Sequence, residues 1–355
     1  MPNFLINTDK KLSNIFRELE NSKNIGLDTE FIRESSYFPQ LALLQLSDEK
    51  NNYCIDILEI KNNTLIIELL TNINIRKILH SSKQDLEVLH YYFGCYPQNI
   101  FDTQIASNLT DCNINISYSN LVKKNFNIEL KEGSWRTDWL KRPISEEKVE
   151  YAANDVKYLI PLSEIFLDKL KQLNRLEWFY EEQDIDLSKS NIITDPKKSW
   201  KKIPIPISLS NNQLLRLQLI SEWREIKAIK KNIPKRWILS DKELLKISTL
   251  KPKELPLFLD NSKHALSIES KENILSIMNN EYESSKEDIS LKLDLSEYNK
   301  KISKCNEVIS KVCEKHNIAS TLIANKKDID YFARGYADIR FLKGWRFKIF
   351  GKLVQ

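Results

Sequence analysis

The stretch Ile25-Gly26-Leu27-Asp28-Thr29-Glu30-Phe31 places two carboxylates inside a short apolar run. The run partly alternates between apolar and polar residues, which predicts a β-strand. Because side chains two residues apart on a strand project from the same face, Asp28 and Glu30 would lie side by side. Two carboxylates in the core of a sheet are costly unless something neutralises their charge. The stretch therefore indicates a site built into a sheet.

Strand and helix patterns alternate on both sides of this stretch, up to about residue 180. Residues 41–46 and 53–57 read as further strands with short links, which predicts an antiparallel meander. Residues 76–80 and 99–102 read as strands that each precede a helix, and residues 145–173 as one long amphipathic helix. This order of elements favours a mixed α/β sheet.

From about residue 184 to 209 the pattern stops. Four lysines (197, 198, 201 and 202) flank Trp200, and Pro204 and Pro206 follow, which is typical of a linker. These lysines could also track the backbone of a nucleic acid, but a solvated linker is the favoured interpretation. Helical patterns resume near residue 210, with a capping box at Ser240 and Glu243, and a polar break near 282–288 separates a last helical part.

The bulk composition is that of a soluble globular protein, with 355 residues, 41% apolar and 29% charged. A chain of this length predicts two or three domains. The formal net charge of +5 is a weak hint of an anionic partner and does not by itself indicate nucleic-acid binding. The five cysteines form no Cys-x-x-Cys pair, which argues against a zinc site or a disulfide framework. We see no secretory signal and no run near the roughly 18 apolar residues of a membrane helix, so we expect a cytoplasmic protein without membrane contact.

Three further residues join the strand pair as candidates for a site. Tyr151 and Asp155 lie four apart on the predicted long helix, hence on one face, and Asp85 lies in the first turn of an earlier helix. Each motif is weak alone, because Asp-x-Glu recurs at residues 241–243, where helix capping explains it, and Tyr-x-x-x-Asp recurs at residues 180–184. Asp85 alone would be interpreted as a charge that favours a helix N-terminus.

If the four acids converge, electrostatics favour a bound metal. Two unit charges about 4 Å apart repel by roughly 4 kcal/mol at an effective dielectric near 20. Divalent cations remove this repulsion, and ligands that are all oxygen point to Mg²⁺ or Mn²⁺.

The order and context of these motifs resemble a known family. The segments 28–31, 80–88 (His80-Ser-Ser-Lys-Gln-Asp85 and onward) and 151–155 resemble the three exonuclease motifs of the DEDD nucleases, and Tyr151 places the chain in the DEDDy branch. The segments 101–106 and 134–143 are similar to the ribonuclease D subgroup. Residues 210–280 resemble an HRDC domain, and the ending at 344–351 resembles the close of bacterial ribonuclease D.

The resemblance implies an α/β fold class, an RNase H-like mixed-sheet exonuclease domain followed by all-α HRDC-type helical domains. The implied limits are residues 1–190 for the exonuclease domain, 191–209 for a linker, 210–285 for an HRDC domain and 286–355 for a second HRDC-like domain.

The resemblance also implies a catalytic site with two Mg²⁺ or Mn²⁺ ions. By this analogy Asp28, Glu30 and Asp155 hold one ion, Asp28 bridges to the second, and Asp85 supports the hydrated shell of the second. Tyr151 would position the attacking water, because a phenol with a pKa near 10 is a poor base at neutral pH. The candidate substrate contacts are Phe31, Gln45, His80, Trp135, Arg136, Trp139 and Arg142. For the two tryptophans, packing within the domain is an equal alternative.

The implied function is a 3′–5′ exoribonuclease that trims RNA 3′ ends and releases nucleoside 5′-monophosphates. The expected partners are tRNA precursors and other structured RNAs with accessible 3′ ends, and a monomer is expected. One alternative is a DNA exonuclease of the same branch, because the metal site does not select the sugar. Another is a non-catalytic nucleic-acid-binding protein with a decayed nuclease fold, which the loss of a motif acid would favour, and none is lost.

Overall fold

The computed structural model describes residues 1–111, 114–131, 138–206, 209–262, 266–279 and 295–355. Contacts divide the chain into two compact units. The first comprises residues 1–32, 40–192 and 293–355, and the second comprises residues 33–39 and 193–292.

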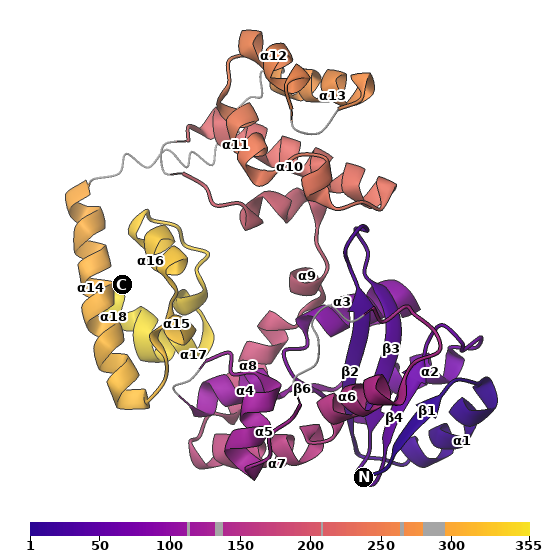
Figure 1. The fold of residues 1–355 in the computed structure, drawn as a ribbon. Helices are drawn as coiled ribbons and strands as arrows, with labels where there is room; N and C mark the ends of the chain where they lie inside the picture. The colour runs from indigo at the N-terminus through magenta and orange to yellow at the C-terminus, as the bar shows by residue number, and fades with distance from the viewer. Residues whose placement is uncertain (112–113, 132–137, 207–208, 263–265, 280–294) are drawn as a thin grey trace. The chain divides into compact units, whose positions relative to one another are not determined.

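The first unit is built on a six-stranded mixed sheet with the strand order β1-β4-β3-β2-β5-β6 (Figure 1). The strands are β1 Asn3–Ile6, β2 Asn24–Ile32, β3 Gln40–Ser47, β4 Asn52–Asp56, β5 Arg76–Leu79 and β6 Ile100–Asp102. Strand β3 runs antiparallel to β2 and β4, while the pairs β1–β4, β2–β5 and β5–β6 are parallel. The predicted meander and the mixed sheet are therefore confirmed. Strand β1 was not predicted, because its four residues are too few to show a periodic pattern.

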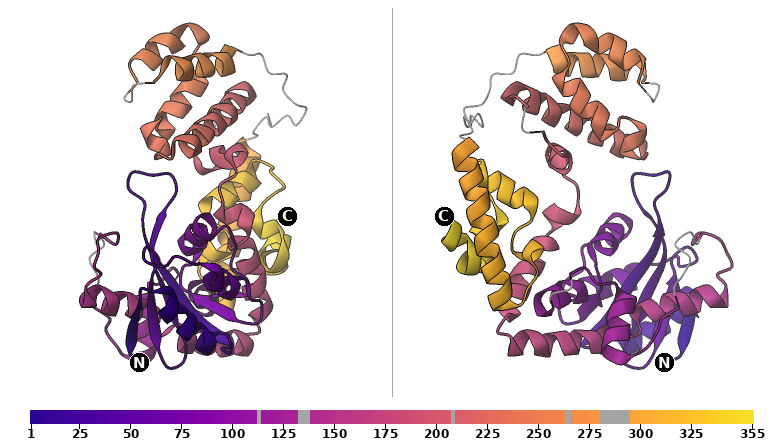
Figure 2. Two further views of the ribbon diagram at one scale, coloured as in Figure 1. Left: turned by 90° about the vertical axis from the view of Figure 1, so that its right-hand side faces the viewer. Right: turned by 60° about the vertical axis from the view of Figure 1, so that its left-hand side comes forward.

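Helices cover both faces of this sheet (Figure 2). Their bounds are α1 Asp9–Leu19, α2 Thr64–Thr71, α3 Lys83–Phe93, α4 Thr103–Thr110, α5 Tyr118–Phe126, α6 Glu146–Val156, α7 Leu159–Gln172, α8 Leu176–Asp186 and α9 Lys189–Ile192. Apolar residues of α1, α2 and α3 pack with Leu27 and Leu44 in one core. On the other face, Ala152 and Ala153 of α6 pack against Leu43 and Cys54. Helix α6 thus lies on the face toward which Asp28 and Glu30 project.

The prediction of one helix over residues 145–173 is wrong. Helix α6 ends at Val156, and α7 begins at Leu159. Pro161 lies in the first turn of α7 and has no backbone N–H to donate to the preceding turn, so it is tolerated at the start of a helix but not in its interior. The proline is visible in the sequence and was a sign of the break.

The second unit is helical, as predicted. Its α-helices are α10 Asn211–Lys231, α11 Asp241–Thr249, α12 Leu255–Asp260 and α13 Ile268–Asn279. Its 3₁₀ helices are η1 Pro196–Lys202, η2 Lys235–Trp237 and η3 Pro252–Glu254. The predicted capping box at Ser240 and Glu243 is present, with the Glu243 N–H donating to Ser240 Oγ at 3.3 Å. Residues 33–39, which join β2 to β3, belong to this unit, where the Tyr37 hydroxyl donates to Glu225 Oε1 at 2.7 Å.

The segment predicted as a linker contains regular structure. The 3₁₀ helix η1 spans Pro196–Lys202, and the side chain of Asp195 caps it by accepting from the Lys197 N–H at 3.0 Å. Ile203 is 2% exposed and belongs to the apolar core of the second unit. Proline at a first helical position suits the cap, so Pro196 starts this helix instead of marking a disordered stretch.

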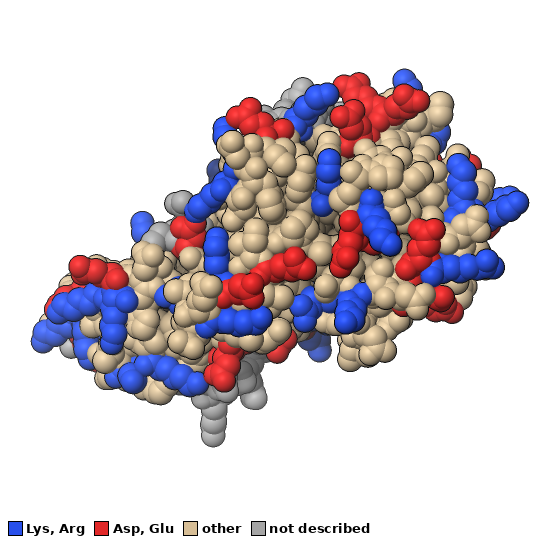
Figure 3. Space-filling view, turned by 90° about the horizontal axis from the view of Figure 1, so that it is seen from below, with Lys and Arg blue, Asp and Glu red and all other residues tan. Residues whose placement is uncertain are grey.

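Charges of both signs lie on the one face of the molecule that Figure 3 shows. On the face shown in Figure 3, Lys and Arg side chains are interspersed with Asp and Glu side chains. This agrees with the small net charge of +5, which arises from 54 basic and 49 acidic residues. Within the described residues, no helix is both long and apolar enough to cross a membrane.

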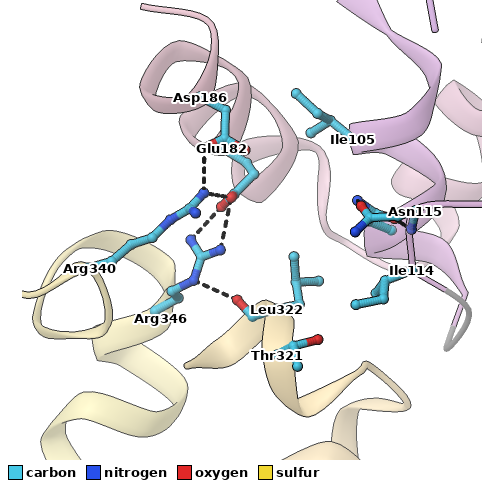
Figure 4. Close-up of a pocket in the computed structure, with 10 residues that line it drawn as sticks. Ile105, Ile114, Asn115, Glu182, Asp186, Thr321, Leu322, Arg340 and Arg346 are labelled. Carbon is cyan, nitrogen blue, oxygen red and sulfur yellow. Dashed lines mark hydrogen bonds and ion pairs between the residues drawn. The ribbon is translucent and has the colours of Figure 1, made fainter. Parts of the chain in front are cut away.

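The C-terminal part of the first unit is attached to α8 by a buried acid. Its elements are α14 Leu295–His316, α15 Ser320–Ile323, α16 Lys326–Ala333, η4 Arg340–Leu342, α17 Gly344–Arg346, η5 Phe347–Gly351 and α18 Lys352–Val354. Glu182 of α8 is 3% exposed and forms ion pairs with Arg340 and Arg346 (Figure 4). Trp345 donates its indole N–H to Glu182 at 3.2 Å and stacks on Trp178 of α8. A cavity of about 220 Å³ lies beside these pairs.

Candidate active site

Three of the predicted acids converge between β2 and α6. Asp28 and Glu30 come from the same face of β2, and Asp155 comes from the last turn of α6. One carboxylate oxygen from each of the three lies within 4.8 Å of the other two. All three side chains remain partly exposed, so the cluster is accessible to solvent and ions. The structure therefore brings residues 28, 30 and 155 into one cluster.

Asp85 reaches the same region from the edge of the sheet. Strand β5 ends at Leu79, and α3 starts at Lys83, beyond the carboxyl end of that strand, where ligands bind in open α/β sheets. The Thr29 hydroxyl donates to Asp85 Oδ1 at 2.5 Å, which joins α3 to β2. Asp85 is 7% exposed, and its charge acts on Asp28. It therefore lies deeper than the other three acids and beside the same cluster.

Burial raises the pKa of every acid in the cluster, and repulsion between the acids adds to the shift for Asp28, Glu30 and Asp155. Burial, followed by repulsion from Asp155 and Asp85, raises the pKa of Glu30 to about 8. Burial raises the pKa of Asp85 to about 7, with the Thr29 hydrogen bond opposing the change. Burial also raises the pKa of Asp155 to about 7, and it raises the pKa of Asp28 well above its usual range. These shifts favour the protonated form of the acids, as expected for buried carboxylates without a counter-charge.

Tyr151 lies one helical turn before Asp155 and hydrogen-bonds to its carboxylate. Burial and then the charges of Asp155, Glu30 and Asp28 raise the pKa of Tyr151 above its usual value. A phenol held in its neutral form can donate a hydrogen bond and cannot serve as a base near pH 7. This geometry agrees with orientation of a water molecule.

Of two further predicted substrate contacts, Gln45 lies beside the acids and His80 is held by hydrogen bonds within the fold. Gln45 is directly opposite Asp28 in the β2–β3 register and is 0% exposed. Neither of its side-chain amide atoms has a hydrogen-bond partner among the described residues. In His80 both ring nitrogens are engaged, Nδ1 with Thr103 Oγ1 at 3.0 Å and Nε2 with the Ile116 carbonyl at 3.1 Å. A contact of either residue with RNA stays a prediction.

The other predicted contacts divide into four cases. Trp139 is 7% exposed and packs near Tyr151, with 6.2 Å between the ring centroids, so its burial favours the packing alternative. The Arg142 guanidinium pairs with the buried Asp56 at 2.6 Å. Phe31 is partly buried against the sheet core. Trp135 and Arg136 lie outside the described residues.

Several residues that position the site were not predicted. Thr29 holds Asp85 in place by donating a hydrogen bond to its carboxylate. At the start of α3, Asp102 accepts hydrogen bonds from the Ser82 N–H at 2.8 Å and from the Ser82 hydroxyl at 2.7 Å. Asp102 also caps α4 through the N–H groups of residues 104 and 105. An aspartate just before a helix is a capping signal, so this second role was readable in the sequence. The contact with Ser82, 20 positions away, was not.

The residues fit a divalent-cation site. The donors are carboxylate oxygens, which suit Mg²⁺ and Mn²⁺. Burial, followed by repulsion from neighbouring acids, raises the pKa of Glu30 and of Asp155, and a bound cation would offset both effects by favouring the charged carboxylates. Asp28, Glu30 and Asp155 are placed to contact one ion, with Asp85 at the side of the cluster nearer α3.

Comparisons with known proteins show which family the chain is similar to. Residues 3–171 match a 3′–5′ exonuclease family model, and residues 213–256 match the HRDC domain model. The chain is 32% identical to ribonuclease D of Zymomonas mobilis over 98% of this chain and 92% of the relative. It is 30% identical to ribonuclease D of Sphingobium indicum over the same shares of the two chains.

A solved structure supports the same assignment over the whole chain. Escherichia coli RNase D, described as an exoribonuclease involved in structured RNA processing, superimposes with a TM-score of 0.84 at 26% identity, covering 100% of this chain and 98% of that one. The predicted fold class, an RNase H-like exonuclease domain with an HRDC helical domain, is confirmed. The limits predicted for the domains, including a second HRDC-like domain over 286–355, stay predictions. The chain belongs to the ribonuclease D family and is a 3′–5′ exoribonuclease of that type.

Proposed function

We propose that this enzyme trims the 3′ ends of tRNA precursors, releasing nucleoside 5′-monophosphates, with two divalent cations held by Asp28, Glu30, Asp85 and Asp155. It would act as a monomer in the cytoplasm. The observation that carries the proposal is the convergence of three carboxylates from β2 and α6 within 4.8 Å, beside a buried fourth.

Each residue of the cluster has a separate task in this proposal. Divalent cations bound there would stabilise negative charge on the attacking and leaving oxygens of an in-line displacement. Asp28 and Glu30 are fixed by the sheet, so they provide the rigid wall of the site. The Tyr151 hydroxyl donates to Asp155, which fixes the direction of the phenol, and the phenol oxygen would accept a hydrogen bond from the attacking water and so orient it.

Products from labelled RNA test the direction and chemistry of cleavage. A 5′-labelled RNA incubated with Mg²⁺ or Mn²⁺ should shorten one nucleotide at a time, and the released products should carry a 5′-phosphate. A matched DNA strand tests sugar selection, because contacts with the 2′-OH distinguish the two. Internal fragments, or release of nucleoside 3′-phosphates, would contradict the proposal.

The variant Asp28→Asn tests the metal site. It should lose more activity than the roughly 10- to 100-fold that loss of an outer partner of a metal ligand costs. Asp168→Asn is a matched control, because Asp168 is an exposed acid on α7 whose partner is the exposed Lys171. Near-normal turnover by Asp28→Asn, with the control unchanged, would show that the site is assigned wrongly.

The substrate class needs its own experiment. Competition between a tRNA precursor with a 3′ extension and an unstructured RNA of equal length gives the ratio of their kcat/KM values. The proposal expects the precursor to be preferred and trimming to stop near the mature 3′ end. Equal kcat/KM values for both RNAs would contradict the proposed role in tRNA maturation but not the exoribonuclease activity.

A further inference from the structure

The junction between α6 and α7 is held open by a side chain from a third helix. In a continuous helix the Tyr158 N–H would donate to the Asn154 carbonyl. Here it donates to the hydroxyl of Tyr118 at 3.0 Å, and that hydroxyl donates to the Asn154 carbonyl at 3.0 Å. The phenol of α5 is therefore inserted into the helical hydrogen-bond ladder, a known cause of sharp helix kinks. Asp155 lies between the two residues that the hydroxyl joins.

A second side chain holds the other side of the same turn. The Ser47 hydroxyl of β3 donates to the Val156 carbonyl at 2.9 Å, and Ser47 is 1% exposed. Space for this contact exists because Gly26, opposite Ser47 on β2, lacks a side chain. The carbonyls of the residues on either side of Asp155 are thus each fixed by a hydroxyl, one from α5 and one from the sheet.

We propose that Tyr118 and Ser47 are positioning residues that keep the α6–α7 break open and thereby aim the Asp155 carboxylate at Asp28 and Glu30. The inference rests on the proposed role of Asp155 as a metal ligand. Neither hydroxyl is assigned a contact with substrate or metal; both act through the backbone on either side of Asp155.

Loss of the Tyr118 hydroxyl would let the junction close. Without the phenol oxygen, the Tyr158 N–H and the Asn154 carbonyl are free to bond directly, as in an ordinary helix. Closing that turn would displace Asp155 from the other acids, whose ligand oxygens lie within 4.8 Å. Outer partners of metal ligands change metal affinity or activity by roughly 10- to 100-fold when removed.

The test compares two tyrosines that lose the same group. Tyr118→Phe removes the inserted hydroxyl, and Tyr96→Phe removes a hydroxyl that donates to the Leu187 carbonyl elsewhere in the same unit. Calorimetric titration of each metal-free protein with MnCl₂ gives its Mn²⁺ affinity, and kcat and KM for RNA are measured in parallel. Ser47→Ala serves as a second variant at the junction, and Asp155→Asn tests the metal site itself.

We expect Tyr118→Phe to weaken Mn²⁺ binding by about 10-fold or more and to lower kcat with KM for RNA nearly unchanged. Ser47→Ala should shift Mn²⁺ affinity in the same direction, while Tyr96→Phe should stay within about twofold of the wild type. Wild-type Mn²⁺ affinity in both junction variants, with Asp155→Asn impaired, would overturn the positioning role alone. Unchanged Mn²⁺ affinity in Asp155→Asn would instead overturn the proposed metal site.

Discussion

Glu30 is the residue whose titration best reports the state of the cluster. Its pKa in the folded protein is about 8, raised mainly by burial and then by the charges of Asp155 and Asp85. In the unfolded chain a glutamate titrates near 4.3, so the folded state binds the proton more tightly. The stabilising contribution is complete below the unfolded pKa and is lost as the pH rises through about 8.

We therefore predict that the metal-free protein is less stable at pH 8.5 than at pH 6. Thermal denaturation in a chelator measures this, and Glu30→Gln should show a smaller fall in Tm because the titrating group is gone. Added Mn²⁺ should raise the Tm more at pH 8.5, where the acids no longer hold protons that compete with the cation. A wild-type Tm that falls no more between pH 6 and pH 8.5 than the Tm of Glu30→Gln would contradict this prediction.

Arg142 is a predicted RNA contact that also forms an ion pair within the fold, and mutation can separate the two roles. Its guanidinium pairs with Asp56, which is 2% exposed, so Arg142→Met leaves a buried carboxylate without its partner. This should cost about 3–5 kcal/mol of unfolding free energy. Adding Asp56→Asn should recover part of the loss in urea denaturation. A rise in KM for RNA in the double variant would support the predicted RNA contact. An unfolding free energy unchanged by Arg142→Met would show that the Arg142–Asp56 ion pair does not stabilise the fold.

At the scale of elements, the site depends on how closely α6 approaches the sheet. Gly26 lies where β2 meets the end of α6, and an added Cβ would lie 2.3 Å from Ser47 Oγ and 2.9 Å from the Val156 carbonyl. Strand glycines mark places where another backbone comes close. The acids of β2 and α6 can meet because this position has no side chain.

We predict that Gly26→Ala costs about 1–3 kcal/mol of unfolding free energy through overpacking. It should also weaken Mn²⁺ binding, because the end of α6 that carries Asp155 must move away from β2. Chemical denaturation and Mn²⁺ titration measure the two effects separately. Wild-type values for both would mean that α6 and the sheet adapt to the extra methyl group without moving the site.

At the scale of the whole molecule, the C-terminal residues 293–355 group with the exonuclease fold and not with the helical unit before them. Glu182 of α8 is the centre of this attachment, since it pairs with Arg346 and Arg340 and accepts from the Trp345 indole. Burial lowers the pKa of Arg346 to about 10, which still leaves it charged near neutral pH.

Glu182→Gln should therefore loosen the C-terminal part, because Arg346 loses its charged partner and Arg340 keeps only its ion pair with Asp186 at 3.0 Å. We expect a cost of about 3 kcal/mol to local opening, measured by hydrogen exchange within residues 295–355. Glu177→Gln, an exposed change on the same helix, is the matched control. Equal exchange in both variants would show that stacking of Trp345 on Trp178 suffices for attachment.

The sequence alone determined five of the six strands and the face shared by Asp28 and Glu30, which follow from alternation along a strand. It also offered Asp85 and Asp155 as candidate acids, and the resemblance to the DEDD nucleases joined the four acids into one predicted site. The Ser240 capping box was predictable from local spacing, since its partners are three residues apart.

Only the tertiary structure decided which residues fix the positions of those acid side chains. The α6–α7 break requires Tyr118 and Ser47, which lie 40 and 109 positions away from the backbone atoms they bind, and the position of Asp85 requires Thr29, 56 positions away. No periodicity in the sequence encodes such contacts, because they arise when separate elements pack and a polar group must find a partner. Local sequence patterns therefore indicate which side chains can form the site. The geometry of the site depends on hydrogen-bond partners that only folding brings together.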